Sequence, residues 1–155
     1  MNKGRCILLI LACIILSGCT HVSIMGPREY HQIDHVLIKE NPEVIVRGFL
    51  GILRDGLSRH GISSDVVLPH YNTGNEYVVT YTALQSWDFT TYLSYAEIRI
   101  EKEGRIVASA TYRLRGKGGL SFRKWAPAKS KINPVIDQLV YSLRKNTTGN
   151  GYMGE

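Results

Sequence analysis

The chain has 155 residues, a length typical of one domain, and its 19 Lys and Arg against 13 Asp and Glu give a formal net charge of +6 at pH 7. Apolar residues make up 44% and charged residues 21%, which excludes disordered and collagen-like chains. Cys6, Cys13 and Cys19 are the only cysteines. A disulfide scaffold, a cysteine-based zinc site and a cysteine nucleophile are therefore excluded from the rest of the chain.

Residues 1–18 are predicted to be an export signal. A basic head precedes an unbroken apolar run from Cys6 to Leu16, and that run is too short for a bilayer-spanning helix of about 20 residues. The segment Leu16-Ser17-Gly18-Cys19 resembles the lipobox of bacterial lipoproteins. An ordinary cleaved signal or a short anchor helix is the alternative.

The lipobox resemblance implies a lipid on the Cys19 thiol, cleavage before Cys19 and acylation of the new amine. Each buried CH₂ of an acyl chain contributes ~0.8 kcal/mol, and two membrane signals suffice for stable attachment. Thr20 follows the cysteine, and in such lipoproteins the absence of aspartate there favours the periplasmic face of the outer membrane. The membrane is thus the first expected partner, and nucleic acid is not expected.

Residues 19–32 are predicted to be a lipidated tether, because they show no clean period and contain the breaker pair Gly26-Pro27. His31 and His35 are four residues apart, a spacing that brings two imidazoles together only on a helix. The pattern of this segment does not predict a helix. We therefore expect no metal site, and no cofactor is expected either.

The single domain is predicted over residues 33–145, with a flexible tail over 146–155. A strand over 33–39 precedes a helix of about 18 residues that begins at Asn41-Pro42 and ends before Gly61. A short strand follows over 62–68. The apolar positions of the helix recur on one face: Ile45, Phe49, Ile52, Leu53, Gly56 and Leu57.

Three longer strands with period-2 alternation are predicted next, over 77–87, 94–101 and 105–115, and Glu103-Gly104 should form the turn between the last two. A final helix over 131–143 should be capped by Ser130, with Pro134 in its first turn. The order β-α-β-β-β-β-α predicts an α+β fold, a two-layer α/β sandwich. Its mainly antiparallel sheet has about five strands, with two helices on one face.

Three segments carry a family resemblance: Trp87-Asp88-Phe89-x-x-Tyr92-Leu93-Ser94, Gly118-Gly119-Leu120-Ser121-x-x-Lys124-Trp125 and Pro134-Val135-Ile136-Asp137. They resemble the Sbal-type family of small proteobacterial lipoproteins, which is uncharacterised and supplies no catalytic or ligand residues. The element order is also similar to the LPS-assembly lipoprotein and to the TolB N-terminal domain, although fold does not fix function.

A basic segment rich in aromatic residues is one candidate surface, for LPS or another anionic lipid. Alternatively, it is a solvated strand face with Trp125 as a core plug. Gly116 to Gly119 lacks phosphate-loop spacing and is interpreted as a connector. The candidate residues are Arg113, Arg115, Lys117, Arg123, Lys124 and Trp125.

An aromatic rim is the second candidate surface, for a peptide or glycan; alternatively, it is the edge of the core. Its residues are Trp87, Phe89, Tyr92 and Tyr95. No catalytic residue is identified, because no GxSxG elbow exists and Asp88 with Ser86 or Ser94 forms no triad. The sequence favours a non-enzymatic, outer-membrane-anchored module that binds an envelope protein or supports an assembly. The alternative is an envelope hydrolase acting on glycan or lipid.

Overall fold

The computed structural model describes residues 20–27, 30–115 and 122–145, so the signal segment, Cys19, Lys117 and the C-terminal tail lie outside it. Over these described residues, two α-helices and a 3₁₀ turn accompany six strands. The strands are β1 (Thr20–Met25), β2 (His35–Lys39), β3 (Ser63–Val67), β4 (Tyr77–Asp88), β5 (Thr90–Lys102) and β6 (Arg105–Leu114). The helices are α2 (Phe49–Arg59) and α3 (Ala128–Arg144), and the 3₁₀ turn is η2 (Phe122–Trp125).

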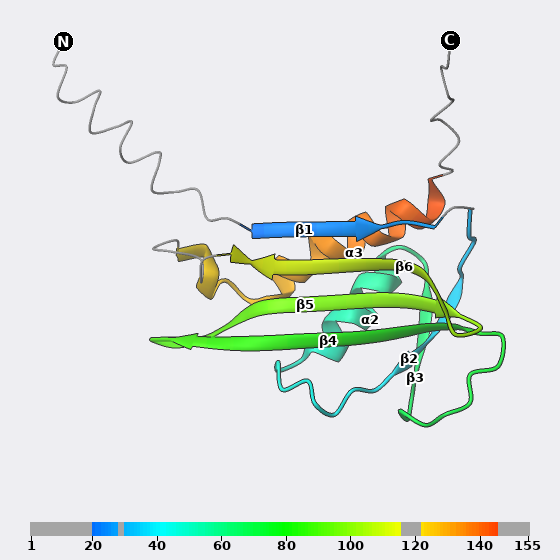
Figure 1. Ribbon diagram of the computed structural model, residues 1–155, viewed down its shortest axis with the longest axis horizontal. Coiled ribbons are helices and arrows are strands. Elements are labelled where there is room, and N and C mark those ends of the chain that lie inside the picture. Colours follow the sequence, from blue (N-terminus) through cyan, green and yellow to red (C-terminus); the bar gives the residue numbers. More distant parts are fainter. Residues whose placement is uncertain (1–19, 28–29, 116–121, 146–155) are drawn as a thin grey trace, which may run out of the picture.

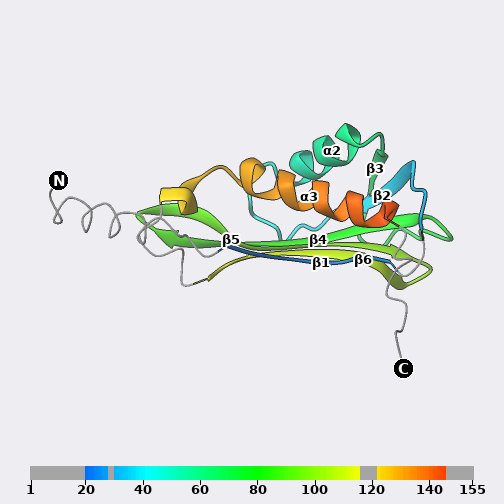
Figure 2. The ribbon, with the colours of Figure 1, turned by 90° about the horizontal axis from the view of Figure 1, so that it is seen from above.

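The six strands form one mixed sheet in the order β1-β6-β5-β4-β2-β3 (Figure 1). Both helices cover the same face of this sheet (Figure 2), which confirms the two-layer α+β sandwich. The strand count is six rather than about five. The sheet is antiparallel from β1 to β4, whereas β2 runs parallel to both β3 and β4.

The additional strand, β1, lies where the sequence predicted a tether. It pairs antiparallel with β6 along its whole length, from Thr20 opposite Leu114 to Met25 opposite Ser109. Val22 and Ile24 are half-buried and pack against the core. The tether prediction is therefore wrong for Thr20–Met25. Two alternating apolar residues suffice to form an edge strand here, because β6 would otherwise have no hydrogen-bonding partner on that side.

The strands β4, β5 and β6 form the predicted meander. Val79, Ile98 and Ala110 point into the core and are buried. The turn at Glu103-Gly104 has φ angles of 51° and 73°, as the tight type I′ hairpin requires. Strict alternation from the buried Ala108 would also bury Ile106, but Ile106 is exposed, because a bulge opposite Ile100/Glu101 shifts the alternation by one residue.

Helix α2 begins at Phe49, eight residues after the predicted start. The Asn41 side chain accepts a hydrogen bond from the Glu43 N–H at 3.0 Å, and its amide donates to the Tyr81 carbonyl at 2.8 Å. Asn41 thus caps a turn that is fixed to β4, and a left-handed Gly48 (φ 73°) separates this turn from the helix. Ile45 is consequently exposed rather than buried.

Helix α3 begins at Ala128, with Pro127 in the capping position. Ser130 therefore does not cap it; its hydroxyl donates to the Pro127 carbonyl at 2.8 Å. Pro134 lies inside the helix rather than in its first turn. The predicted apolar face is confirmed, since these residues are all buried: Ile132, Ile136, Leu139, Val140 and Leu143. The two helices approach closely where Gly56 lies against Ile136.

Candidate functional site

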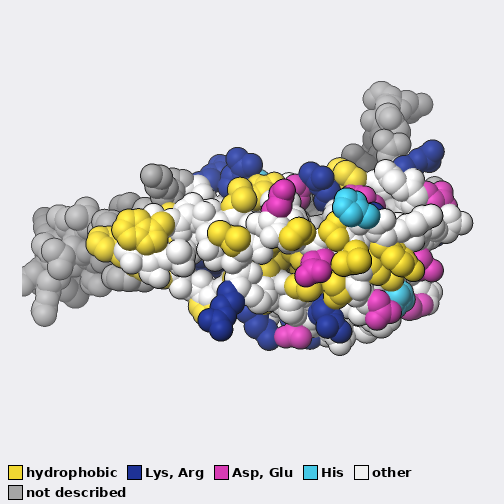
Figure 3. All heavy atoms as spheres, turned by 90° about the horizontal axis from the view of Figure 1, so that it is seen from below, with side chains coloured by type: hydrophobic (Ala, Val, Ile, Leu, Met, Phe, Trp, Pro, Cys, Tyr) yellow, Lys and Arg dark blue, Asp and Glu magenta, His cyan; other side chains and the backbone are white. Residues whose placement is uncertain are grey.

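The β4–β5 hairpin ends in an apolar tip. Asp88 pairs with Thr90, so the single residue Phe89 makes the turn, and its φ of 59° lies in the left-handed region. Phe89 is 87% exposed and Trp87 is 75% exposed. Figure 3 shows exposed hydrophobic side chains at this narrow end of the molecule. A bulky residue with positive φ is uncommon and marks a conformation that its surroundings must hold in place.

The turn η2 holds this tip from one side. The Lys124 ammonium forms an ion pair and hydrogen bond with the Asp88 carboxylate, although Lys124 is only 5% exposed. The Trp125 ring N–H donates to the Asp88 carbonyl at 3.1 Å, and its ring meets Phe89 edge-on at 6.5 Å between centroids. The Lys124 Nζ also lies 4.5 Å from the Trp125 ring centroid. Lys124 and Trp125 of the basic candidate surface therefore contact the hairpin tip of the aromatic one.

Tyr92 does not belong to an exposed rim. Its side chain is buried, and the Nζ atoms of Lys124 and Lys131 each lie 5.9 Å from its ring centroid. Lys131 reaches under the hairpin and donates to the carbonyls of Leu93 and Lys124. Burial lowers the pKa of Lys131. The Tyr92 hydroxyl is buried with no hydrogen-bond partner among the described residues, so Tyr92 acts as packing beneath the tip.

Tyr95 lies on the sheet face away from the helices. Its hydroxyl donates to Glu97 at 3.2 Å, and Arg113 lies over its ring at 5.3 Å. Arg99 donates two hydrogen bonds of 2.9 Å to the same Glu97 carboxylate. Burial, followed by the charge of Glu97, raises the pKa of Tyr95. Tyr95 is therefore part of a polar ladder on the open face and is separate from the tip.

The predicted basic surface does not form one patch over the described residues. Arg113 lies on the open face, Arg115 is exposed beyond the end of β6, and Lys124 is buried against Asp88. Lys124, which the sequence analysis placed on the candidate surface for an anionic lipid, is thus not exposed. Arg123 lies within η2, and Lys117 lies outside the described residues.

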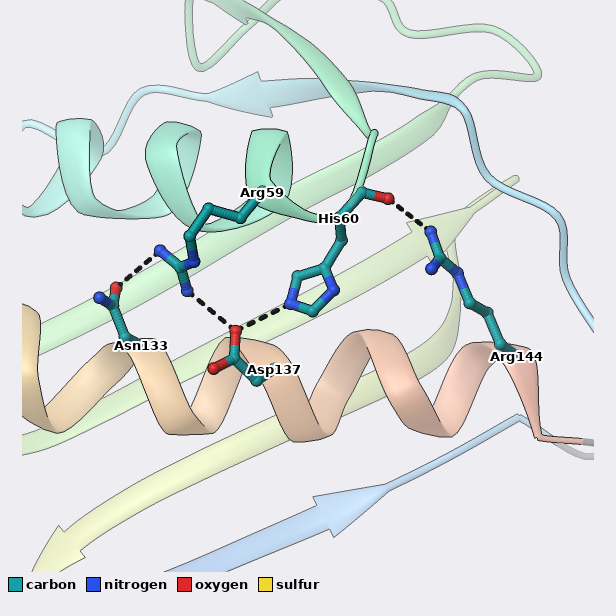
Figure 4. Close-up of polar contacts among 5 residues, drawn as sticks. All are labelled: Arg59, His60, Asn133, Asp137 and Arg144. Atoms are coloured by element: carbon teal, nitrogen blue, oxygen red, sulfur yellow. Dashed lines mark hydrogen bonds and ion pairs between the residues drawn. The ribbon is translucent and has the colours of Figure 1, made fainter.

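A second polar cluster, which the sequence did not reveal, joins the two helices (Figure 4). The Asp137 carboxylate accepts hydrogen bonds of 2.8 Å from both the His60 ring and Arg59. Arg59 also donates to Asn133 at 3.2 Å, and Arg144 donates to the His60 carbonyl. The hydrogen bond from His60, followed by that from Arg59, lowers the pKa of Asp137. Asn133 and Asp137 are four residues apart and so share one face of α3. This spacing was the only sign of the cluster in the sequence.

An open groove of about 570 Å³ lies beside this cluster, between β1 and α3. Ile24, Asp137 and Tyr141 are among the residues that line it. Across 20–27, 30–115 and 122–145, no three His, Cys, Asp or Glu side chains gather as metal ligands would. Neither α2 nor α3 nor any other described helix has the length and apolar character to cross a bilayer.

Comparison with known proteins finds similar folds but no matching family. No protein-family model matches the chain, and no curated protein matches it. Among solved structures, a point variant of the PelC dodecamer from Paraburkholderia phytofirmans is similar, with a TM-score of 0.54 and 15% identity over 83% of this chain and 100% of that chain. A second PelC dodecamer from the same organism has a TM-score of 0.52 and 16% identity, covering 81% and 98%. At this level of identity, the likeness shows a shared fold.

Proposed function

We propose that the protein is a lipid-anchored envelope protein on the periplasmic face of the outer membrane and acts as a non-enzymatic assembly module. Its anchor is Cys19, and its first partner is a further copy of the same chain. The observation that carries the assembly is the likeness to two PelC dodecamers, whose chains are covered to 100% and 98%. The lipobox at Leu16 to Cys19 supports the anchor and the envelope location.

The two edges of the sheet offer a route to assembly. Strands β1 and β3 lie at opposite edges, and the outer row of backbone N–H and C=O groups on such a strand is a template for pairing with another chain. Apolar side chains near β3 are exposed, namely Val66, Leu68 and Tyr71. Because the two edges differ, contact between them is head-to-tail, the interface type that generates rings.

The polar clusters support a structural role. Asp88 pairs with Lys124, and Asp137 pairs with Arg59 and His60. These charges fasten elements distant in the sequence: η2 to the hairpin, and α2 to α3.

The proposal is tested on the full chain, which is expressed with its signal and extracted in detergent. Native mass spectrometry then measures the mass of the protomer and of the complex. Acylation should add the mass of the lipid to wild-type protein and not to Cys19→Ser. The wild-type complex should weigh several protomers. An unacylated chain would refute the anchor, and a monomer at micromolar concentration would refute the assembly.

A matched pair of variants tests the sheet edge. Val66→Lys places a charge on the exposed edge strand β3 and should shift the complex toward monomer. Ile45→Lys places the same charge on another exposed residue, before α2, and should leave the complex intact. Equal effects of the two variants would show that the β3 edge is not the contact.

A further inference from the structure

The hairpin tip formed by Trp87, Asp88 and Phe89 has a conformation that the core does not need. Two large aromatic side chains stand in solvent there, one of them on a left-handed backbone. Meanwhile, Asp88 is fastened by Lys124 and Trp125. Exposed apolar groups held on a strained and supported turn are typical of a contact surface.

The position of the first residue of β1 indicates which partner such a surface would contact. Thr20 already pairs with Leu114, so Cys19 is one residue from the sheet, and one residue spans at most ~3.6 Å. An acyl chain on Cys19 would thus be joined to the rigid sheet with almost no slack. The absence of a tether fixes which end of the domain faces the bilayer.

The tip lies at that same end. Figure 1 shows that β1 begins at the end of the sheet where the β4–β5 hairpin finishes. By register, Thr20 lies beside Leu114, next to the rung that joins Arg113 to Tyr95 and Tyr95 to Leu84. The hairpin continues for four further pairs, from Gln85–Leu93 to Asp88–Thr90, which is about 13 Å at ~3.3 Å per residue.

We propose that the tip inserts into the interface of the leaflet that holds the Cys19 acyl chains, giving each protomer a second, apolar membrane contact. This inference rests on the proposed lipid anchor. Trp favours the headgroup region, and Phe favours the acyl boundary below it. The exposed Arg115 follows the end of β6 beside Thr20, where its charge would attract anionic headgroups. Two contacts at one end would hold the strands steeply to the membrane plane.

Tryptophan quenching tests the insertion, because Trp87 is one of only two tryptophans. Acylated full-length protein is reconstituted into vesicles of phosphatidylethanolamine and phosphatidylglycerol. The vesicles carry either ordinary phosphatidylcholine or phosphatidylcholine brominated near the headgroup end of its chains. Brominated lipid should reduce wild-type emission by up to about half. Trp87→Phe keeps an aromatic tip but removes the reporter, so its emission should be nearly unchanged.

Two further variants act as controls. Phe89→Ser keeps Trp87 but weakens insertion, so quenching should fall while the circular dichroism spectrum stays the same. Tyr141→Trp in the Trp87→Phe background places a reporter on an exposed position near the C-terminal end of α3. That end lies beside Gly26, after β1 has finished, at the far end of the sheet. This reporter should not be quenched.

The following results would overturn the inference. Acylated wild-type protein that is indifferent to brominated lipid would show that the tip stays out of the membrane while the anchor stands. Quenching of equal strength in wild type and Trp87→Phe would show that the Trp87 side chain does not enter the bilayer. Phe89→Ser that dissociates the complex without any wild-type quenching would assign the tip to a protein contact. A chain that carries no lipid would remove the anchor and this inference together.

Discussion

Replacing Asp88 by alanine should destabilise the protein far more than a comparable change elsewhere. The Lys124 side chain is 6% exposed and would lose its carboxylate partner. Removing one partner of a buried ion pair costs about 3–5 kcal/mol. Asp88 itself is 37% exposed, and the Trp125 ring would still face the ammonium, so we expect about 2–3 kcal/mol.

Asp55→Ala is the matched control, because it also removes an Asp–Lys pair. Asp55 accepts a hydrogen bond from Lys129 at 3.0 Å, but these side chains are 61% and 55% exposed. Such a surface pair contributes about 0–1 kcal/mol. In urea unfolding, where the slope is about 1–3 kcal/mol/M, Asp88→Ala should lower the midpoint by about 1 M and Asp55→Ala by far less.

The double variant Asp88→Ala/Lys124→Met completes the test. It removes the buried charge along with its partner and fills the space with a side chain of similar volume, so the unfolding free energy should recover to within about 1 kcal/mol of wild type. If Asp88→Ala costs no more than Asp55→Ala, Lys124 is not a buried charge. If the double variant is as unstable as Asp88→Ala, packing by the lysine stem matters rather than the ion pair.

Two further predictions concern the contact between the helices. Gly56→Ala should destabilise the protein by about 1–2 kcal/mol in urea unfolding, because the new Cβ would meet the Ile136 Cδ1 at 2.5 Å. Gly51→Ala in the same helix meets nothing within 4 Å and should stabilise it by about 0.5–1 kcal/mol; the same sign for both would refute the close approach. The hydrogen bonds to Asp137 lower its pKa below the ordinary 3.8, so they stabilise the fold above about pH 4, and this contribution is lost as the pH falls through the lowered pKa. Asp137→Asn should therefore flatten the acid loss of unfolding free energy, and an unchanged slope would show that the His60 contact does not form in solution.

The fold was predictable where the pattern was long and regular. Val79, Ile98 and Ala110 belong to strands of ten residues or more, over which period-2 alternation excludes a helix. The start of α2 was not predictable from its local signals. Asn41 and Pro42 are good helix starters, but the Asn41 amide bonds to the backbone of β4, and this tertiary contact outweighs the local preference.

The candidate site was predicted only in part. Its aromatic and basic residues were identified, but the pairing of Asp88 with Lys124 joins positions 36 residues apart, and no local pattern encodes such a contact. A lysine is ordinarily exposed. Because Lys124 is buried, it pairs with Asp88 inside the protein instead of standing on a surface for an anionic lipid. The only sign of strand β1 in the sequence is the alternation of Val22 and Ile24. This pattern is so short that the segment is easily interpreted as a linker.

The proposed membrane contact restricts how the protomers could assemble. Every copy must present Thr20 and Phe89 to the same leaflet, so no symmetry axis can reverse the strands. Antiparallel pairing of β1 with another β1 has a two-fold axis perpendicular to the strands, and it would turn one of the two tips away from the bilayer.

Within one protomer, however, β1 runs antiparallel to β3. This follows because β1 is antiparallel to β6, β6 to β5 and β5 to β4, whereas β4, β2 and β3 are parallel. Pairing the β1 edge of one copy with the β3 edge of the next is therefore antiparallel while all tips stay on one side. Among edge-to-edge contacts, a ring with its axis along the strands satisfies both proposals, whereas a β1–β1 dimer satisfies neither.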